Sequence, residues 1–580
     1  MDRSAVLHIP MSQYAYMLDE EKMVFRLRAK RDDLDRCFLY YGDRACRQTP
    51  VHFERIAMEV TAQDEMFDYY EVTLKSPYRR ICYYFELISE SETILYYGDF
   101  FSDHCVDDRS EYYQFPYMHR ADLVQPPEWA QDTVIYNIFP DSFADGPAHI
   151  SGKERTCEFN GKKTSGKRGG TLKGILENVE YLENLGVTAI YLNPIFAAGE
   201  YHKYDLLDYF HVDPCFGTNE EFKELVECFH RHGIRVIIDG VFNHCGWQFP
   251  MFEDVIEKGE NSAYRDWFYG LHFPVVRPRD AEAYPDYECF GYERMMPKLA
   301  TDREKVAEYF CRVCRYWLSE FGIDGWRLDV ASEVNDGFWR QFYRTAKSVN
   351  PKAILIGEVW ESAGHWLDGT IFDSTMNYDF RRHCRRFFAE KSIDAKAFDS
   401  RVTNMRMRYR KQSVYAQLNL LDSHDVSRFL SLCGGDRTTY TLAVLFQMTF
   451  PGMPCIFYGD EKGMEGMTED EYRQAMQWEK EDPLTSFFRK AIRLRREETA
   501  LRRGNFRTVS AAQGSGLYVY AREWNNQRIL TALNRGEGPA RLEETWLEGS
   551  LLWERGRKGC LLQPGGFAVI KKEQNDVGDN

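Results

Sequence analysis

The sequence predicts a multidomain protein built around a central (β/α)8 barrel, a TIM barrel, with a β-sandwich before it and another after it. Three observations predict this architecture. The middle of the chain alternates short apolar runs with helical patterns, which is typical of parallel strands joined by helices. Both ends carry short alternating strands separated by turn residues. The chain has 580 residues, which is too long for a single hydrophobic core.

The N-terminal part of the chain, residues 1–122, is predicted to form an antiparallel β-sandwich. Apolar and polar residues alternate in EKMVFRLRAK (21–30), YYEVTLK (69–75) and RRICYYFELIS (79–89), and turn residues separate these runs. Such a succession of short strands is typical of a sandwich. Pro126 and Pro127 then mark a linker to the next domain.

Residues 123–244 and 301–488 are predicted to form the barrel, because short apolar runs alternate there with helical periodicity. The eight expected strands lie at 133–139, 187–196, 235–241, 324–330, 353–360, 370–376, 415–421 and 455–458. The clearest helical patterns between them lie at 172–185, 222–232 and 304–321.

Two segments do not follow the barrel pattern. Residues 245–300 have little periodicity and many Gly, Pro, Trp and Tyr residues, and they are too many for a simple loop. We therefore expect a small inserted domain there. From residue 489 onward short strands return, as in GLYVYARE and GGFAVIKK, which predicts a C-terminal β-sandwich over 489–580.

Four of the predicted barrel strands end in acidic residues. Arg327 and Asp329 are two positions apart, so their side chains share one face of a strand. A neighbouring guanidinium keeps a carboxylate ionised, as a nucleophile requires, although a structural ion pair is the alternative. The C-terminal ends of barrel strands converge, so these ends are expected to form one active site. Its candidate residues are Asp239, Asn243, His244, Arg327, Asp329, Glu358, His424 and Asp425.

Composition narrows the range of partners. The formal net charge of -16 argues against nucleic acid and anionic membranes as partners. Aromatic residues make up 15% of the chain, which suits platforms that stack on sugars, although core packing is the alternative. No signal peptide or membrane-spanning stretch is found, and the 15 cysteines are scattered, so we expect a cytoplasmic protein with reduced thiols.

The strand-end segments resemble a known family. DGVFNH (239–244), GWRLDVASE (325–333), GEVW (357–360) and LLDSHD (420–425) are similar to the four short sequence regions of the α-amylase family, glycoside hydrolase family 13. By pattern, the chain is most similar to the neopullulanase, cyclomaltodextrinase and maltogenic amylase group. MPKL (296–299) and the N-terminal domain with its LYYGD segment support that group, and the resemblance covers nearly the whole chain.

The resemblance implies a retaining mechanism that uses two carboxylates on opposite sides of the anomeric carbon. Asp329 is the implied nucleophile and Glu358 the implied acid/base, whose acidity the apolar run before it would weaken. Asp425 matches the third acid, which binds sugar hydroxyls and stabilises the transition state. The implied substrate-binding or orienting residues are Arg327, His244, His424, Tyr204, His202, Asn243, Asp239, Trp360 and Glu333.

The chain departs from the pattern of this group at three positions. Ala300 and Ser332 stand where the group usually or often has asparagine, and Glu361 stands where many members have histidine. Position 361 lies near the acceptor side, so linkage preference and the balance between hydrolysis and sugar transfer stay open.

The resemblance also implies features outside the catalytic residues. Segment 245–300 corresponds to the small B domain that forms one wall of the cleft, and the N-terminal domain helps to form a homodimer. No cofactor is required. Relatives bind calcium through acids near the first strand and a Gly-Gly-Asp turn, of which this chain keeps Asp141 and Asp145 but has Thr171 in the turn. Because a hard cation favours charged oxygen ligands, calcium is expected to be weak or absent.

The expected function is hydrolysis of α-1,4 bonds in maltooligosaccharides, cyclodextrins, pullulan or starch, with α-1,6 cleavage and transglycosylation as open additions. An exo-acting α-glucosidase or oligo-1,6-glucosidase is one alternative, and the N-terminal sandwich and MPKL argue against it. A non-catalytic glycan-binding protein is another, but Asp329, Glu358 and Asp425 are all present.

Overall fold

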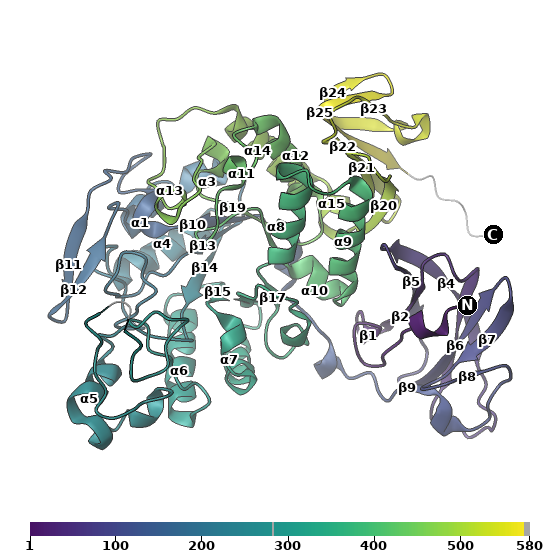
Figure 1. Cartoon of the computed structure of the whole chain (residues 1–580), viewed down its shortest axis with the longest axis horizontal. Coiled ribbons are helices and arrows are strands. Elements are labelled where there is room, and N and C mark those ends of the chain that lie inside the picture. The colour runs from purple at the N-terminus through teal and green to yellow at the C-terminus, as the bar shows by residue number, and fades with distance from the viewer. Residues whose placement is uncertain (281–282, 574–580) are drawn as a thin grey trace. The chain divides into compact units, whose positions relative to one another are not determined.

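A computed structural model of the chain describes residues 1–280 and 283–573 (Figure 1). The chain divides into two compact units, which we describe separately. One unit comprises residues 1–125, 391–415 and 503–580, and the other comprises 126–390 and 416–502. The expected domains were contiguous along the chain except at the insertion, whereas in the structure the central segment 391–415 groups with the N- and C-terminal β-structure.

The N-terminal domain is antiparallel throughout and its strands share one core. Its strands are paired in the order β1-β2-β5-β4-β3-β6-β7-β8, with β9 on β6. They are β1 (Ala15–Met17), β2 (Lys22–Lys30), β3 (Arg36–Asp43), β4 (Glu54–Gln63), β5 (Phe67–Lys75), β6 (Ile81–Ser89), β7 (Glu92–Tyr96), β8 (Phe101–Ser102) and β9 (Tyr113–Phe115). Phe25 of β2, Leu39 of β3 and Phe85 of β6 are fully buried in the same cluster, so the two ends of the sheet face each other as a sandwich.

The central segment of this unit is held by the N-terminal sandwich. Helices α9 (Ala395–Met407) and α10 (Lys411–Ala416) form most of it. Buried Arg26 of β2 donates to the carbonyl oxygen of Met407 at 3.0 Å, and Gln412 donates to the carbonyl oxygen of Met17 at 2.7 Å. These hydrogen bonds tie a segment that sequence analysis assigned to the barrel to the first strands of the chain.

Eight parallel strands form the barrel in the other unit. In chain order they are β10 (Ile135–Ile138), β13 (Ala189–Leu192), β14 (Arg235–Gly240), β15 (Gly325–Leu328), β16 (Ile354–Gly357), β17 (Ser374–Thr375), β18 (Leu418–Leu420) and β19 (Met453–Phe457). They are paired in the order β17-β16-β15-β14-β13-β10-β19-β18. A parallel bridge between Met376 and Leu418 closes the circle. The predicted (β/α)8 barrel is confirmed.

The barrel interior is filled by apolar side chains from every second position. Ile135, Tyr191, Ile237 and Ile356 belong to one buried cluster, as expected for a closed barrel of eight strands. Gly325 allows the fourth and fifth strands to approach, because a Cβ there would lie 2.3 Å from the backbone oxygen of Ile354.

The barrel helices cover the strands on the outside (Figure 1). They are α2 (Leu172–Leu176), α3 (Val179–Leu185), α4 (Asn219–Arg231), α6 (Glu304–Glu320), α7 (Asp336–Val349), α8 (Tyr378–Cys384), α12 (Arg437–Thr449) and α14 (Pro483–Glu497). Two expectations are corrected. The helix expected at 172–185 is two helices, and the strand expected from residue 415 begins at Leu418 because Tyr415 and Ala416 end α10.

The inserted segment 245–300 has one regular helix among its described residues, α5 (Pro250–Lys258). Phe252 of α5 packs edge-on against Phe268 and Tyr287, each with ring centroids 5.0 Å away. Leu299 donates its backbone N–H to the carbonyl oxygen of Asn243 at 3.0 Å, which ties the end of the insertion to the residues that follow β14. The segment therefore has a small aromatic core of its own beside the third strand.

The C-terminal strands form an antiparallel sheet in the order β20-β21-β22-β25-β23, with β24 on β25. They are β20 (Asn505–Ala511), β21 (Leu517–Trp524), β22 (Gln527–Asn534), β23 (Ala540–Arg541), β24 (Ser550–Lys558) and β25 (Leu561–Glu573). The boundary expected at residue 489 falls inside α14, which belongs to the barrel unit. Across the described residues, no helix is both long and apolar enough to cross a bilayer.

Candidate active site

The guanidinium of Arg327 lies at the centre of the predicted site and is surrounded by four carboxylates. Arg327 is fully buried, and its Nη1 lies 3.1 Å from Oδ1 of Asp239 and 2.7 Å from Oδ1 of Asp329. Its Nη2 lies 2.9 Å from Oε1 of Glu358 and 3.8 Å from Oδ2 of Asp425. One cation thus gathers acids from the C-terminal ends of four different strands, β14, β15, β16 and β18, as the convergence of strand ends predicted.

Asp329 and Glu358 each stand one residue beyond neighbouring strands. The backbone N–H of Glu358 donates to the carbonyl oxygen of Leu328 at 2.9 Å, which continues the ladder between β15 and β16. Val330 has a φ of 44°, which is unusual for a β-branched residue. In this conformation its N–H donates to Oε2 of Glu358 at 2.8 Å. The backbone after Asp329 therefore orients the second carboxylate.

Tyr204 and His424 form a second part of the site. Their rings are parallel within 5°, with centroids 5.6 Å apart. The Tyr204 hydroxyl contacts Nε2 of His424 and lies 3.0 Å from Oδ2 of Asp239. Asn193, which follows β13, contacts Nδ1 of His424 at 2.9 Å, and Tyr191 donates to Asp239 at 2.6 Å. Sequence analysis missed Asn193 and Tyr191, although both lie in the second predicted strand.

His244, Asn243 and Glu333 lie together on the side of the insertion. The His244 ring stacks on Phe290 of the inserted segment, with centroids 5.1 Å apart. Asn243 donates to Oε2 of Glu333 at 3.3 Å, and the Lys298 ammonium bridges Asn243 and Glu333. Lys298 belongs to the MPKL segment, so that motif holds two of the predicted residues in place. Sequence analysis did not predict Phe290 as a residue of the site.

Trp360 lies at the edge of the site and contacts the acid/base candidate directly. Its indole N–H donates to Oε1 of Glu358 at 3.0 Å, while 45% of the residue is exposed. The ring stacks on buried Tyr378 at the start of α8, with centroids 3.8 Å apart and planes within 11°. Tyr378 therefore holds an exposed aromatic platform beside Glu358, a role that sequence analysis did not predict.

Arg473 is a further residue that sequence analysis missed. Its Nε donates to the carbonyl oxygen of His424 at 2.7 Å, and its Nη2 lies 3.5 Å from Oδ1 of Asp425. It also forms an ion pair with Glu469. Arg473 comes after the eighth strand in a segment without a recognised motif, so only the folded chain shows that it holds the loop that carries Asp425.

Asp239, Asp329 and Asp425 have raised pKa values and so retain protons more readily than ordinary acids. Burial raises the pKa of Asp329 well above its usual range, and nearby Glu358 adds to the shift while Arg327 opposes it. Burial likewise raises the pKa of Asp239 and raises that of Asp425 to about 7. The Asp425 side chain keeps 25% exposure, which moderates the effect of burial there. Arg327 favours the ionised form of Asp329, as expected, but burial and the neighbouring carboxylates outweigh its effect on the pKa.

The three histidines of the site are held neutral. Burial lowers the pKa of His202 and of His244 to about 3, and it lowers the pKa of His424 well below its usual range. His202 accepts a hydrogen bond from the backbone N–H of Tyr204 at 3.1 Å through Nδ1. Neutral imidazoles donate and accept hydrogen bonds without adding charge, as binding of uncharged hydroxyl groups requires.

The raised pKa of Asp329 predicts a pH-dependent stability. In the unfolded chain an aspartate ionises near 3.8, but the folded chain keeps this proton to higher pH. The folded state therefore binds more protons above that value, and its stability falls as pH rises, by about 1.4 kcal/mol per pKa unit. We expect Asp329→Asn to raise the melting temperature relative to wild type at about pH 8 and much less at about pH 4. Equal differences at both values, by thermal unfolding, would contradict this.

The predicted residues line one cavity of about 570 Å³. Its walls include Asp329, Glu358 and Asp425 together with His202, Tyr204, His244, Trp360, Glu333, Phe290 and Arg473. Arg327, Asp239, Asn243 and His424 lie behind this wall, where they contact the lining residues. The cavity has the concave shape and mixed aromatic and acidic lining of a ligand site.

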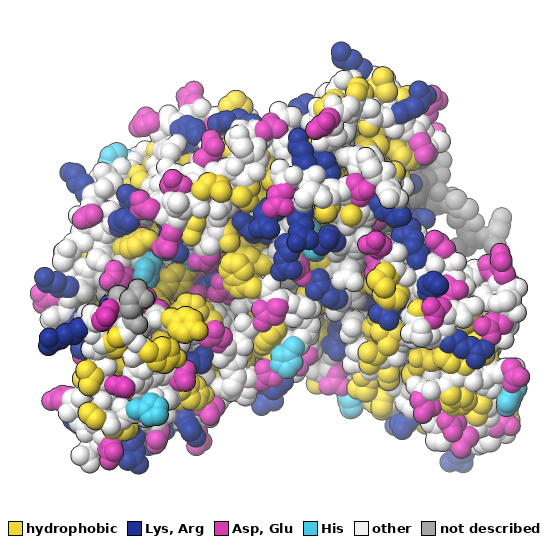
Figure 2. All heavy atoms as spheres, in the orientation of Figure 1, with side chains coloured by type: hydrophobic (Ala, Val, Ile, Leu, Met, Phe, Trp, Pro, Cys, Tyr) yellow, Lys and Arg dark blue, Asp and Glu magenta, His cyan; other side chains and the backbone are white. Residues whose placement is uncertain are grey.

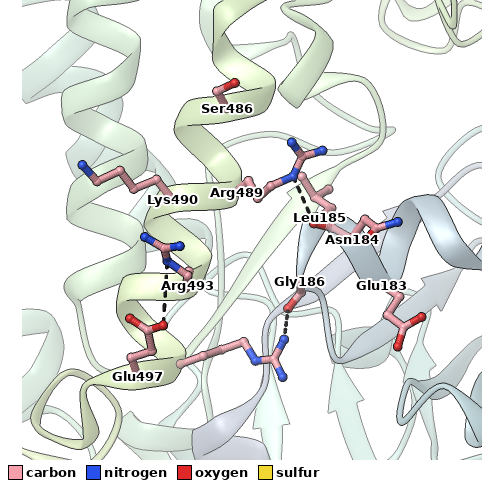
Figure 3. Close-up of a pocket in the computed structure, with 10 residues that line it drawn as sticks. Glu183, Asn184, Leu185, Gly186, Ser486, Arg489, Lys490, Arg493 and Glu497 are labelled. Carbon is pink, nitrogen blue, oxygen red and sulfur yellow. Dashed lines mark hydrogen bonds and ion pairs between the residues drawn. The ribbon is translucent and has the colours of Figure 1, made fainter.

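A larger cavity of about 730 Å³ lies elsewhere, between α3 and α14 (Figure 3). Arg489 donates to the carbonyl oxygen of Asn184 at 3.0 Å, and Arg496 donates to that of Gly186 at 3.3 Å. Arginines thus cap the C-terminal carbonyls of α3, which is a structural role. This cavity has no paired carboxylates poised around a cation, so size alone does not identify the active site.

The two acids considered for calcium are engaged by the protein itself. Asp141 accepts backbone N–H groups from Lys167 and Arg168 at 3.0 Å, and Asp145 pairs with His149 at 2.8 Å. Within residues 1–280 and 283–573, no group of three His, Cys, Asp or Glu side chains is arranged to hold a metal ion.

Known protein families agree with this geometry. Residues 137–524 match the family model described as "Alpha amylase, catalytic domain", and residues 1–119 match "Alpha amylase, N-terminal ig-like domain". The chain belongs to the α-amylase family. It is a glycoside hydrolase similar to the neopullulanase, cyclomaltodextrinase and maltogenic amylase members.

Individual relatives match over nearly their whole length. The Neopullulanase 2 of Thermoactinomyces vulgaris is 42% identical, and the match covers 95% of this chain and 94% of that protein. A Cyclomaltodextrinase of Geobacillus thermopakistaniensis is 40% identical over 99% and 100% of the two chains. A solved Cyclomaltodextrinase structure superposes with a TM-score of 0.88 at 35% identity, over 99% of this chain and 98% of that one.

Proposed function

We propose that the chain is a retaining α-glucan hydrolase that cleaves α-1,4 glucosidic bonds by double displacement, with α-1,6 cleavage an open addition. The observation that carries the proposal is the placement of Asp329 and Glu358 at the ends of adjacent strands, both within 2.9 Å of one guanidinium. Two carboxylates that close together at the wall of one cavity suit attack by one and proton transfer by the other.

In the first step, an oxygen of Asp329 attacks the anomeric carbon while Glu358 gives its proton to the leaving glycosidic oxygen. In the second, Glu358 takes a proton from water, and the water oxygen replaces Asp329 at the anomeric carbon. The cycle starts with Asp329 ionised and the proton on Glu358, and the Arg327 guanidinium, 2.7 Å from Asp329, favours the ionised form of the nucleophile by lowering its pKa. The N–H groups of Val330 and Trp360 orient Glu358 for both transfers.

The remaining residues bind the sugar in this proposal. Tyr204 offers its ring face beside the reacting centre, and Asp425 lies 3.1 Å from Nε2 of His424 so that both reach the same hydroxyl groups. Nε2 of His244 is buried and has no hydrogen-bond partner among the described residues, so it is available to a sugar hydroxyl. Trp360 and Glu333 border the acceptor side, where a sugar acceptor would compete with water for the glucosyl-enzyme.

Product analysis tests the function. The purified protein is incubated separately with β-cyclodextrin, pullulan, maltotriose and soluble starch, and products are separated by chromatography. We expect cyclodextrin to be opened and pullulan to yield panose. The names of the relatives support these substrates. Glucose released stepwise from maltotriose with intact cyclodextrin would instead indicate an exo-glucosidase, and no turnover would indicate a glycan-binding protein.

We propose that calcium does not stabilise the loop of Asp141 and Asp145, because both carboxylates already accept hydrogen bonds or pair with cations. The expected result is the same melting temperature in calcium and in chelator. A large calcium-dependent rise would contradict the proposal. Asp145→Asn serves as a control, since it removes one candidate ligand without touching the carboxylates around Arg327.

We also propose a homodimer formed through the N-terminal domain and a cytoplasmic location. Both rest on similarity, the second on a relative from Bacillus subtilis named "Intracellular maltogenic amylase" that is 35% identical. Light scattering of the intact chain measures its mass, and a monomer mass at all concentrations would contradict the dimer. Cell fractionation tests the location.

A further inference from the structure

A pocket of about 420 Å³ on the N-terminal domain is lined by three arginines and no carboxylate. Its lining residues are Arg44, Ala45, Arg80, Arg109, Ser110 and Gln114. On the face of the protein shown in Figure 2, acidic and basic side chains are interspersed. The chain has a net charge of -16, so a hollow lined by three arginines and no carboxylate is a local excess of positive charge. Such a pocket is suited to a negatively charged ligand.

The fold brings these arginines together from distant parts of the chain. The backbone N–H of Arg44, just after β3, donates to the carbonyl oxygen of Arg80, just before β6, at 3.2 Å. Arg109 reaches the same place from the segment before β9 and donates to the carbonyl oxygen of Cys46 at 2.6 Å. The loop after β3 is thereby fixed against Arg109, so the pocket is a feature of the packed domain.

The arginines differ in what they already bind. Arg109 is engaged with backbone oxygens of the loop that follows Arg44. Arg44 and Arg80 form no ion pair with any described residue, and the Arg80 guanidinium lies 5.4 Å from the centre of the Tyr117 ring. The nearby carboxylate of Asp108 is occupied by the N–H and hydroxyl of Ser110, at 2.9 and 2.7 Å. Two guanidiniums are therefore free to take an external anion.

Gln114 also lines the pocket. Its amide nitrogen donates to the carbonyl oxygens of Arg109 and Tyr112, at 3.1 and 3.2 Å. Its Oε1 is buried and accepts no hydrogen bond from the described residues. The pocket thus offers guanidinium donors for an anion beside an uncharged glutamine whose amide nitrogen is already engaged.

We propose that this pocket binds the phosphate group of a small phosphomonoester, such as a hexose phosphate. Guanidinium groups match the geometry of phosphate oxygens and bind them through paired N–H donors. The groove between α3 and α14 is less suited to this role, because Glu183 and Glu497 line it and Arg489 and Arg496 already bind backbone oxygens.

Isothermal titration of the intact protein with glucose 6-phosphate tests the proposal, with inorganic phosphate, sulfate and glucose as comparisons. The variant Arg44→Gln/Arg80→Gln removes the two free guanidiniums. Arg47→Gln/Arg79→Gln is the matched control, since both residues are exposed neighbours that do not line the pocket and the charge change is equal. We expect the first variant to weaken glucose 6-phosphate binding at least tenfold and the control to leave it within twofold.

The four ligands together assign the source of the anion. Equal affinity for inorganic phosphate and glucose 6-phosphate would retain the phosphate site but assign it to free phosphate. Absence of binding by wild type, an equal loss in both variants, or equal binding of glucose would overturn the proposal. Thermal unfolding of both variants verifies that they are folded, and hydrolysis of maltotriose remains a separate readout of the active site.

Discussion

Replacing Asp329 with asparagine is expected to lower kcat on every α-glucan by about 10⁴-fold or more. An amide cannot form the covalent bond to the anomeric carbon that double displacement requires. The shape of the site should persist, because asparagine still accepts a hydrogen bond from Nη1 of Arg327, which lies 2.7 Å from the present carboxylate. Steady-state kinetics on maltotriose and β-cyclodextrin measure the loss.

Thermal unfolding separates loss of chemistry from loss of fold in this variant. Since Asp329 is buried with a raised pKa, the amide should make the folded protein more stable at alkaline pH while activity disappears. Asp145→Asn is the matched control, because it makes the same substitution outside the carboxylate cluster and should keep nearly full activity. Substantial activity in Asp329→Asn would remove Asp329 from the nucleophile role.

Replacing Glu358 with glutamine is expected to lower kcat on maltotriose by about 10³-fold, because the leaving oxygen no longer receives a proton. The effect should depend on the leaving group. Fluoride leaves without protonation, so the first step with α-glucosyl fluoride should stay fast in this variant. The N–H groups of Val330 and Trp360 bind different oxygens of Glu358, so glutamine, with one oxygen acceptor, keeps one of these two hydrogen bonds.

The two variants together assign the two roles. In Glu358→Gln, activation of water is also slowed, so a glucosyl group should accumulate on Asp329 and be found by peptide mass spectrometry. Asp329→Asn should release no fluoride from the same substrate. If Glu358→Gln loses activity on α-glucosyl fluoride and on maltotriose to the same extent, Glu358 is not the proton donor and another acid of the cluster must be considered.

The barrel and its acids were predictable because both depend on local patterns. Buried parallel strands require continuous apolar runs, and the eight runs appear in the sequence at nearly the positions of β10 and β13 to β19. Strand ends meet on one face of a closed barrel, so the amino-acid sequence was enough to expect Asp329, Glu358 and Asp425 together. Element ends were less predictable, as Tyr415 shows by ending a helix where a strand was expected.

Residues that support the site from other segments were not predictable. Tyr378 stacks under Trp360, and Arg473 holds the loop of His424, but neither lies in a recognised motif. Their roles depend on contacts between elements far apart in the sequence. The same holds for Arg44, Arg80 and Arg109, which are ordinary surface arginines in the sequence and form a pocket only after the sheet has paired.

The central barrel, the family and the acids at the strand ends could be predicted from the amino-acid sequence, because strand periodicity and short motifs involve residues that are neighbours in the chain. The raised pKa values of Asp329 and Asp425, by contrast, depend on contacts that form only when the chain folds. A single Arg-x-Asp pair suggested an ionised Asp329, but folding buries that pair and places Asp239, Glu358 and Asp425 around the same guanidinium. One positive charge cannot offset four buried negative charges, so the cluster holds protons that the isolated motif would release.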